Sequence, residues 1–343
     1  MSIILFISLF VCLYKSKFYT NPQRDYLKKR RSQSISGVFV LLVFLRHFGQ
    51  YINIEKSDKL FYLFDQCMGQ LIVIPFLFYS GYGVMKSIMI KGDSYVTAIP
   101  KHRILRVWLH FVIAVSMYLF LGIAMHRNYS LRRILLSFIG LESIGNSNWY
   151  IFAIIAMYIF TWIAFKVFQK DTKKVLMLML FFTLLYIGVW YGNTETQFYN
   201  TIHIYPFGMI YAYYQDRIDH FILRSNKRMF AILAILVVLL GVVRLSRLLI
   251  DCSFFMDLCL YWISGILFIC CVLEMSLYVQ FGNPVLDFLG THIFEIYILQ
   301  RIPMNLLYGM EKYLYFVVCL VITVLISIGY KFFEKKLDKF LKL

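Results

Sequence analysis

Long apolar runs, separated by short polar segments, dominate the pattern of this chain. A hydrocarbon core of roughly 30 Å takes about 20 helical residues to cross, and most of the runs approach this length. The runs end at charged residues or at clusters of Gly, Asn and Pro, which are typical of helix ends and loops. This pattern predicts membrane-spanning helices at residues 35–54, 67–90, 107–125, 149–168, 175–192, 199–216, 229–249, 255–279, 291–310 and 313–332.

A shorter apolar run, from Ser2 to Tyr14, precedes the first of these helices. It lacks a basic segment before it and a clear small-residue cleavage site after it, so we expect an uncleaved apolar helix. Its length leaves open whether it crosses the membrane. The predicted organisation is a short helix with a basic cytoplasmic segment (1–34), a membrane domain (35–332) and a basic cytoplasmic tail (333–343).

The composition agrees with this organisation. Hydrophobic residues make up 61% of the 343 residues and charged residues only 15%, with a mean hydropathy of +0.71. A soluble domain is nearer half apolar and a quarter charged. We therefore predict an all-α polytopic membrane protein, a bundle of about ten transmembrane helices plus the short N-terminal helix, surrounded by the lipid bilayer.

The net charge of +17 follows the predicted topology. If the basic stretch at 15–31 is cytoplasmic and the helices alternate, 25 of the 35 Lys and Arg residues fall on cytoplasmic segments. This bias is typical of proteins that keep their positive loops inside. We expect a multi-pass protein of the cell membrane with basic loops and the C-terminus in the cytoplasm. Anionic lipid accounts for the charge, and we expect no nucleic-acid partner.

Arg46 and His47 interrupt the apolar run of the first predicted span. Ionisable side chains at membrane depth are costly and are usually kept for a function or a buried partner. His47 lies about 12 residues into this span, roughly 18 Å along it and past the middle of the hydrocarbon core. Gln50 and Tyr51 share its helix face, whereas Arg46 points about 100° away. His47 is either a general base or a packed histidine bonded to a neighbouring helix.

Two further segments place small or basic residues near the ends of predicted helices. In PFLFYSGYGVMK, Ser80 and the two glycines either allow close helix packing or line a site. In KHRILR, Arg103 and Arg106 share one helix face next to Lys101. This cluster either clamps a phosphate or anchors the chain at the membrane surface.

A polar segment with aromatic residues at its end, GNSNWY, follows Glu142. Amides and aromatic faces suit a carbohydrate, so Asn148, Trp149 and Tyr150 are candidates for a sugar site on the non-cytoplasmic side. The alternative is a loop closed by a tryptophan at the membrane interface.

A late segment, GTHIFEIYILQRIP, carries Glu295, Gln300 and Arg301 inside a predicted span. We expect Glu295 to pair with a cation, because an unpaired charge at this depth is costly. The seven cysteines form no CxxC motif, so we predict neither a metal site nor a disulfide framework.

Taken in order, these segments resemble the integral-membrane acyltransferase-3 family, which contains polytopic O-acyltransferases of envelope polysaccharides. LLVFLRHF looks like the family's first conserved helix, PFLFYSGYGV like its F-x-x-S-G-Y/F signature, and KHRILRVW like its basic K-R-x-x-R turn. NWYIFAIIAMY resembles its W-F/Y-I helix start, YPFGMIYAY its small-residue G-M helix, and FLGTHIFEIYILQRIP its late L-G-x-x-S-x-x-I-Y-L-x-H/Q segment. The order and approximate spacing agree across residues 35–332.

The resemblance implies transfer of an acyl group, usually acetyl, from cytoplasmic acyl-CoA to a hydroxyl of an envelope polysaccharide or glycolipid. His47 matches the family's essential His, and Arg103 and Arg106 match the basic turn thought to meet the CoA phosphates. The chain departs from the family at three positions: Ser36 where members commonly have an Arg eleven residues before the His, and Thr291 and Gln300 where many have Ser and His.

We therefore expect a membrane acyltransferase that holds no bound cofactor. The resemblance implies acyl-CoA as co-substrate, usually acetyl-CoA. In this hypothesis Lys101, Arg103 and Arg106 hold the CoA phosphates, and His47 deprotonates the acceptor hydroxyl or takes up the acyl group transiently. The expected substrate-binding residues are Ser80, Glu142, Asn148, Trp149, Tyr150 and Glu295.

Two other functions remain open at this stage. One is a polysaccharide or glycolipid exporter of the same family without transfer chemistry. The charged residues within predicted spans could line its path: Arg46, Lys86, Arg244, Glu274, Glu295 and Arg301. The other is a sensor or partner-holding subunit. The sequence leaves open the acceptor, acetyl against succinyl, the leaflet of transfer and the oligomeric state.

Overall fold

The computed structural model describes residues 1–54, 58–169, 171–223, 226–250 and 253–343. Within these ranges the chain is almost entirely helical, and eight helices are long and apolar enough to cross a membrane. The prediction of an all-α polytopic membrane protein is confirmed. The short N-terminal helix is also present, as α1 (Ser2–Leu13).

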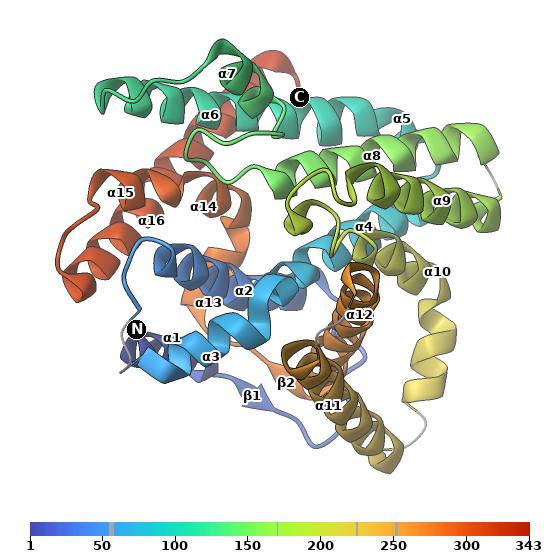
Figure 1. The fold of residues 1–343 in the computed structure, drawn as a ribbon. Helices are drawn as coiled ribbons and strands as arrows, with labels where there is room; N and C mark the ends of the chain where they lie inside the picture. The colour runs from blue at the N-terminus through green and yellow to red at the C-terminus, as the bar shows by residue number, and fades with distance from the viewer. Residues whose placement is uncertain (55–57, 170, 224–225, 251–252) are drawn as a thin grey trace.

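The elements follow one another along the chain as Figure 1 shows. The first half contains α1, β1 (Lys17–Phe18), α2 (Lys29–Gly49), α3 (Lys59–Met68), the 3-10 segment η2 (Gly69–Val73), α4 (Ile74–Lys91), α5 (Asp93–Ile99), the π-helical segment η3 (Pro100–Leu105), α6 (Arg106–Ala124), α7 (Leu131–Phe138) and α8 (Trp149–Phe168). The second half contains α9 (Thr172–Trp190), the 3-10 turn η4 (Thr196–Phe198), α10 (Ile204–Ile222), α11 (Asn226–Leu249), α12 (Phe254–Tyr278), β2 (Val279–Gln280), α13 (Pro284–Thr291), α14 (Ile293–Leu299), α15 (Arg301–Leu306) and α16 (Lys312–Leu341).

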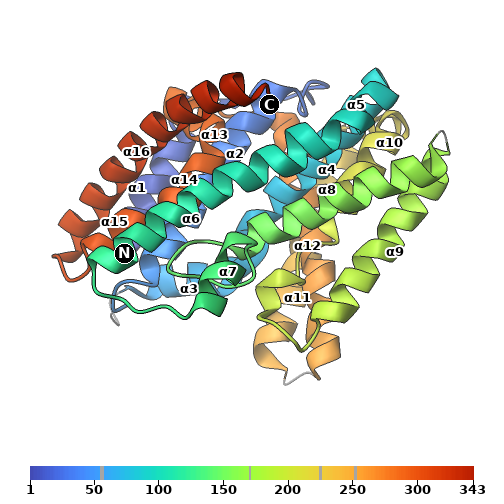
Figure 2. The same cartoon turned by 90° about the horizontal axis from the view of Figure 1, so that it is seen from above.

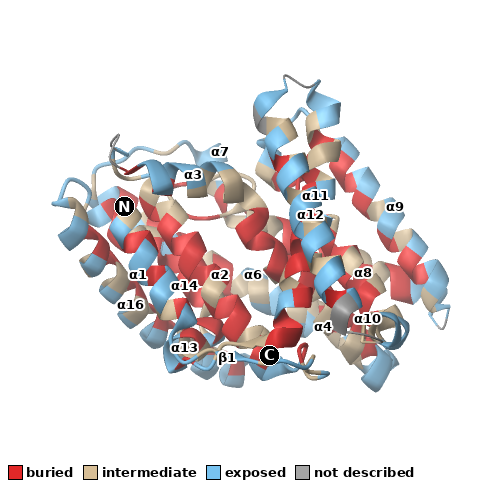
Figure 3. Cartoon of the chain, turned by 90° about the horizontal axis from the view of Figure 1, so that it is seen from below, coloured by how far each residue is buried: buried red, intermediate tan, exposed pale blue. Residues whose placement is uncertain are grey.

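The molecule has two distinct ends, which lie at the two ends of its long helices. In Figure 3, α3, α7 and the N-terminus lie at one end, and α13, β1 and the C-terminus lie at the other. Strands β1 and β2 pair antiparallel at the second end, where they join the basic segment before α2 to the end of α12. The basic segment is therefore attached to the helix bundle by backbone hydrogen bonds.

Burial separates central helices from those that face lipid. Two thirds of the most apolar stretch of α2 is buried, against about a tenth of that of α11. Red segments in Figure 3 accordingly concentrate on α2 and α14, whereas α11 shows much pale blue surface. Exposed apolar side chains on α9 and α11 suit contact with lipid tails.

Three predicted spans differ from the helices observed. The predicted helix at 199–216 corresponds to α10, which runs from Ile204 to Ile222 and is not among the eight helices apolar enough to cross a membrane. The predicted helix at 35–54 ends earlier, at Gly49. The predicted helix at 291–310 is broken into α14 and α15, which meet at Gln300. Pro303 lacks an N–H group, so it leaves the carbonyl of Leu299 without its usual helical partner and favours a break there. The broken segment lies inside the protein, where side chains satisfy freed backbone groups.

Helices α4 and α10 approach each other closely through two glycines. A Cβ atom added at Gly81 would collide with the backbone carbonyl of Tyr205, and one added at Gly208 would collide with that of Phe78. The close-packing interpretation of the SGYG segment is thus confirmed for Gly81. Ser80, its neighbour, lines a cavity, as described below.

We expect Gly81→Ala to lower the thermal unfolding temperature of the purified protein, because a backbone carbonyl cannot yield as a flexible side chain would. Overpacking of this kind typically costs about 1–3 kcal/mol. Gly83→Ala is the matched control, since a Cβ there meets no atom within 4 Å. Unfolding followed by heating in detergent compares the two variants, and equal unfolding temperatures would contradict the close approach.

Candidate functional site

Two cavities penetrate the helix bundle. The first, called here the Arg103 cavity, has a volume of about 800 Å³ and is lined at one end by Lys29, Arg103 and Arg106. The second, the His47 cavity, has a volume of about 380 Å³ and a polar lining. Val43 and Val73 line both cavities, so the two spaces adjoin at this apolar pair.

Helix α2 runs past both cavities. Lys29 and Ser36 line the Arg103 cavity, Val43 lines both, and His47 lines the second. His47 follows the first residue of the helix by 18 positions, about 27 Å along the axis. It therefore lies in the last turn of α2, because the helix ends at Gly49 and not at the predicted residue 54.

The buried side chain of Gln300 is the hydrogen-bond partner of His47. Its Nε2 lies 2.8 Å from Nδ1 of His47 and 3.3 Å from the carbonyl oxygen of Tyr297. An amide nitrogen can donate two hydrogen bonds, one to each of these acceptors. In this arrangement Nδ1 of His47 accepts a hydrogen bond from the amide of Gln300, and the ring proton of the neutral imidazole resides on Nε2.

Arg301, the first residue of α15, lines the same cavity and is held by three neutral groups. Its Nε donates to Ser147 Oγ at 3.1 Å, its Nη1 to Tyr51 Oη at 3.3 Å and its Nη2 to Gln50 Oε1 at 2.6 Å. Gln50 and Tyr51 lie just beyond the end of α2. They contact Arg301 from the turn that follows α2, and not from a helix that continues past Gly49.

Arg46 lines the His47 cavity together with His47. The prediction that it points away from the histidine is wrong in this respect. Its Nε lies 3.3 Å from Oδ1 of Asp65, on α3. Arg46 and His47 lie in the last turn of α2, which ends at Gly49, and residues on more than one face of this turn line the cavity.

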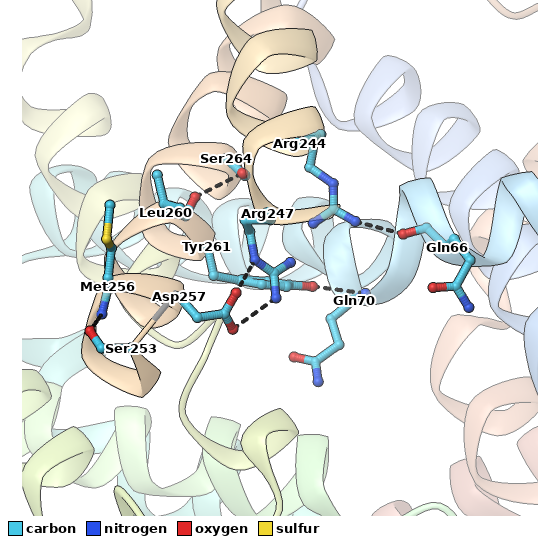
Figure 4. A network of polar contacts seen from close by, with 10 residues as sticks. All are labelled: Gln66, Gln70, Arg244, Arg247, Ser253, Met256, Asp257, Leu260, Tyr261 and Ser264. Atoms are coloured by element: carbon cyan, nitrogen blue, oxygen red, sulfur yellow. Dashed lines mark hydrogen bonds and ion pairs between the residues drawn. The ribbon is translucent and has the colours of Figure 1, made fainter. Parts of the chain in front are cut away.

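A network of polar contacts joins α11 and α12 to α3 and η2, beside the part of the His47 cavity that Gly69 and Gln70 line (Figure 4). The guanidinium of Arg247 contacts the carboxylate of Asp257 at 2.6 and 2.9 Å. Arg244 donates to the carbonyl oxygen of Gln66 at 2.7 Å, and the backbone N–H of Gln70 donates to Tyr261 Oη at 2.9 Å. The network fixes η2, whose Gly69 and Gln70 line the His47 cavity.

Aromatic residues position Arg103 in the other cavity. Its Nε donates to Tyr95 Oη at 3.0 Å, and its guanidinium lies about 6 Å from the rings of Tyr95 and Tyr158. Tyr158 in turn shares a hydrogen bond of 2.9 Å with Ser80. Arg103 belongs to η3, where the helix widens after Pro100, and such π-helical insertions recur at functional sites.

A buried acidic cluster, which the sequence analysis missed, borders the Arg103 cavity. Nη2 of Arg106 lies 2.5 Å from Asp338 Oδ2, and Nε2 of His110 lies 2.9 Å from Asp338 Oδ1. Glu334 Oε1 lies 3.7 Å from the other ring nitrogen of His110. The one available signal was the spacing of Glu334 and Asp338, four residues apart and therefore on one face of α16.

Glu295 also lines the Arg103 cavity and pairs with Lys331 at 3.1 Å. The expected pairing of Glu295 with a cation is thus confirmed. Both helices involved, α14 and α16, contribute to the same face of the cavity.

The structure sorts the predicted site residues into three groups. His47, Asn148 and Trp149 line the His47 cavity. Neither cavity has Lys101 or Glu142 in its described lining. The remaining predicted residues line the Arg103 cavity: Ser80, Arg103, Arg106, Tyr150 and Glu295.

Aromatic rings form the contact between the two groups. The ring of Tyr297 lies 6.1 Å from that of His47 and 5.6 Å from that of Tyr150, centroid to centroid. Tyr150 and Tyr297 line the Arg103 cavity, whereas Trp149 lines the His47 cavity. The start of α8 and the middle of α14 therefore stand between the two spaces, beside Val43 and Val73.

The described residues offer no cluster of His, Cys, Asp and Glu side chains that could hold a metal ion. Six cysteines are described and all six are free, while Cys252 lies outside the described residues. The arrangement instead combines a cavity with fixed cations, a second polar cavity with a histidine, and a narrow apolar boundary.

These features define a polytopic membrane protein with a polar site inside its helix bundle. The family model of the acyltransferase domain matches residues 32–331, which is most of the chain. The chain belongs to the acyltransferase-3 family and is a membrane acyltransferase. No curated protein and no solved structure matches it.

Proposed function

We propose that the protein transfers an acetyl group from cytoplasmic acetyl-CoA to a hydroxyl of an envelope polysaccharide or glycolipid. The observation that carries this proposal is the pair of cavities that adjoin at Val43 and Val73. One of them offers cations to a phosphate-bearing donor, and the other offers a histidine among polar groups to an acceptor. An acyl group has to pass only this boundary to meet the acceptor.

The Arg103 cavity is the proposed donor site. Lys29, Arg103 and Arg106 suit the phosphates of CoA, since guanidinium groups bind phosphate through paired hydrogen bonds. Arg106 is already paired with Asp338, so we assign the larger part of phosphate binding to Arg103, which donates to the neutral hydroxyl of Tyr95. In this proposal the end of the molecule that carries α13, β1 and the C-terminus faces the cytoplasm, in line with the bias in its positive charge.

The His47 cavity is the proposed acceptor site. Its lining includes the amides of Gln50, Gln70 and Asn148, the hydroxyl of Ser147 and the indole of Trp149. Such groups can exchange hydrogen bonds with several sugar hydroxyls while the indole covers an apolar sugar face. Glu142 does not line this cavity, so we do not assign it a role in acceptor binding.

The chemistry follows from the placement of His47. When the carboxamide of Gln300 is turned so that its Oε1 accepts from Nδ1–H of His47, the Nε2 lone pair of the imidazole is free. The acceptor hydroxyl then gives its proton to Nε2 as its oxygen attacks the thioester carbon. The tetrahedral intermediate collapses, the carbon–sulfur bond breaks, and the CoA thiolate leaves and takes up a proton.

Radiolabelled acetyl-CoA tests the proposal. We expect membranes that contain the protein, and that also contain newly made envelope glycan, to incorporate label into a glycan ester that mild alkali releases. Membranes without the protein are the control. Glycan that crosses the membrane without acquiring label, at the same rate with and without acetyl-CoA, would favour an exporter and contradict transfer.

A further inference from the structure

The His47 cavity carries an excess of positive charge. Among its described lining residues are two guanidinium groups, Arg46 and Arg301, and one carboxylate, Glu195. Glu195 also accepts a hydrogen bond from the side chain of Gln197. The neutral groups of the lining suit a sugar, but they do not account for the two arginines, Arg46 on α2, whose Nε pairs with Asp65, and Arg301 on α15.

Arg301 is a cation whose charge is not compensated. Its three hydrogen bonds all end on neutral oxygens, those of Ser147, Tyr51 and Gln50. Among the described residues, no carboxylate lies within ion-pair distance of its guanidinium. The three bonds fix the orientation of the group without neutralising it. A charge held in this way inside a membrane protein is costly unless a partner of opposite sign completes the site.

A second arginine, Arg244, lies near Arg46 beside the His47 cavity. Nη1 of Arg46 and Nη2 of Arg244 both lie within 4.0 Å of the point where a side chain at Gly69 would begin. Arg46 has Asp65 as its acidic partner, whereas Arg244 donates to the backbone carbonyl of Gln66 (Figure 4). Arg244 is 8% exposed, so its charge acts on the cavity from behind the wall.

We propose that the acceptor carries an oxyanion, a carboxylate or a phosphate, which Arg301 and Arg46 bind in the His47 cavity. Guanidinium groups pair with both kinds of oxyanion through parallel hydrogen bonds. Arg46 precedes His47 in the chain and Arg301 follows Gln300, the partner of His47. An oxyanion bound between the two arginines therefore brings a hydroxyl of the same sugar unit, or of the next one, to the imidazole. The acceptor class is an acidic glycan.

This inference rests on the proposed function for the name of its ligand, but its test does not require transfer. The purified full-length protein in detergent is heated in the absence of acyl-CoA with sodium glucuronate, glucose 6-phosphate or glucose. Sodium chloride keeps the ionic strength equal. We expect the unfolding temperature to rise with the concentration of at least one charged sugar and to stay unchanged with glucose. The two charged probes distinguish a carboxylate from a phosphate as the preferred group.

Substitutions locate the binding. Arg301→Gln is expected to weaken the binding of the charged sugar by at least about tenfold, as the loss of a charge-assisted hydrogen bond does. Arg46→Gln is a second variant with the same expected direction, should the first fail to fold. Arg132→Gln, on the exposed surface of α7, is the matched control and should bind normally. Arg103→Gln reports whether the anion binds in the donor cavity instead.

The proposal is overturned if charged and uncharged sugars stabilise the protein equally, or if neither does. It is also overturned if Arg103→Gln abolishes the effect while Arg301→Gln and Arg46→Gln leave it intact. If the charged sugar binds as expected and no acetyl transfer is found, the anion site stands and the proposed reaction fails. If transfer occurs to neutral glycan and is insensitive to Arg46→Gln, the reaction stands and the anion site fails.

Discussion

Replacing His47 by Gln should reduce acetyl transfer by about 10²- to 10⁴-fold, the usual contribution of a general acid–base group. The imidazole lines the polar cavity and is anchored by Gln300, so it is placed to exchange a proton with a bound hydroxyl. A glutamine at position 47 can keep a hydrogen bond to Gln300 but cannot take up a proton near neutral pH. Transfer of label from acetyl-CoA to glycan measures the loss.

The control for this variant has to separate chemistry from folding. His220→Ala removes an exposed histidine of α10 that lines neither cavity, so transfer should be unchanged. The His47→Gln protein should match the parent in its unfolding temperature and in its elution from a sizing column. A folded His47→Gln protein that transfers acetyl within a factor of about three of the parent would remove His47 from the reaction.

The fold class could be predicted because the bilayer imposes a simple rule on the sequence. Apolar runs of the right length became helices in α4, α8, α9, α12 and α16. The rule failed where polar residues and Pro303 break the helix at α14 and α15, since length and hydropathy describe a span but not its interruption. It also failed at the end of α2, where Gln50 and Tyr51 turn to bind Arg301.

The site could be predicted only in part, for a different reason. His47 stood out because an ionisable residue within an apolar run is rare, and Arg103 stood out because it belongs to a basic cluster at the end of a predicted helix. Which charges share a cavity depends on how helices distant in sequence pack, and α2 meets α15 across about 250 residues. Arg46 was therefore assigned to the wrong face, and the cluster of His110 with Glu334 and Asp338 was missed. The residue pattern within one helix does not indicate which residues of another helix it will contact.

Gln300 is a second position at which substitution should strongly reduce transfer. Its side chain is fully buried and its Nε2 bonds both His47 Nδ1 and the carbonyl of Tyr297, while its Oε1 has no partner among the described residues. With Nε2 toward His47, the neutral imidazole carries its proton on the other ring nitrogen and presents a donor. A half-turn of the carboxamide presents Oε1 instead, so that Nδ1 donates and Nε2 is free to accept a proton. Only the second orientation leaves a lone pair on the ring free, so His47 acts as a base in that orientation, and the same bond to Oε1 is kept when the imidazole becomes an imidazolium.

We therefore expect Gln300→Leu to lower the rate constant of transfer by about 5- to 150-fold, the equivalent of 1–3 kcal/mol for a buried partner left unpaired. The KM for acetyl-CoA should stay unchanged, because Gln300 does not line the Arg103 cavity. Gln300→His, which restores the residue that many family members have here, should recover much of the activity, since an imidazole can also donate to or accept from His47. Steady-state kinetics on the three proteins decides the matter. A positioning role for Gln300 is contradicted if Gln300→Leu raises the KM and leaves the rate constant intact, or if leucine and histidine at this position behave alike.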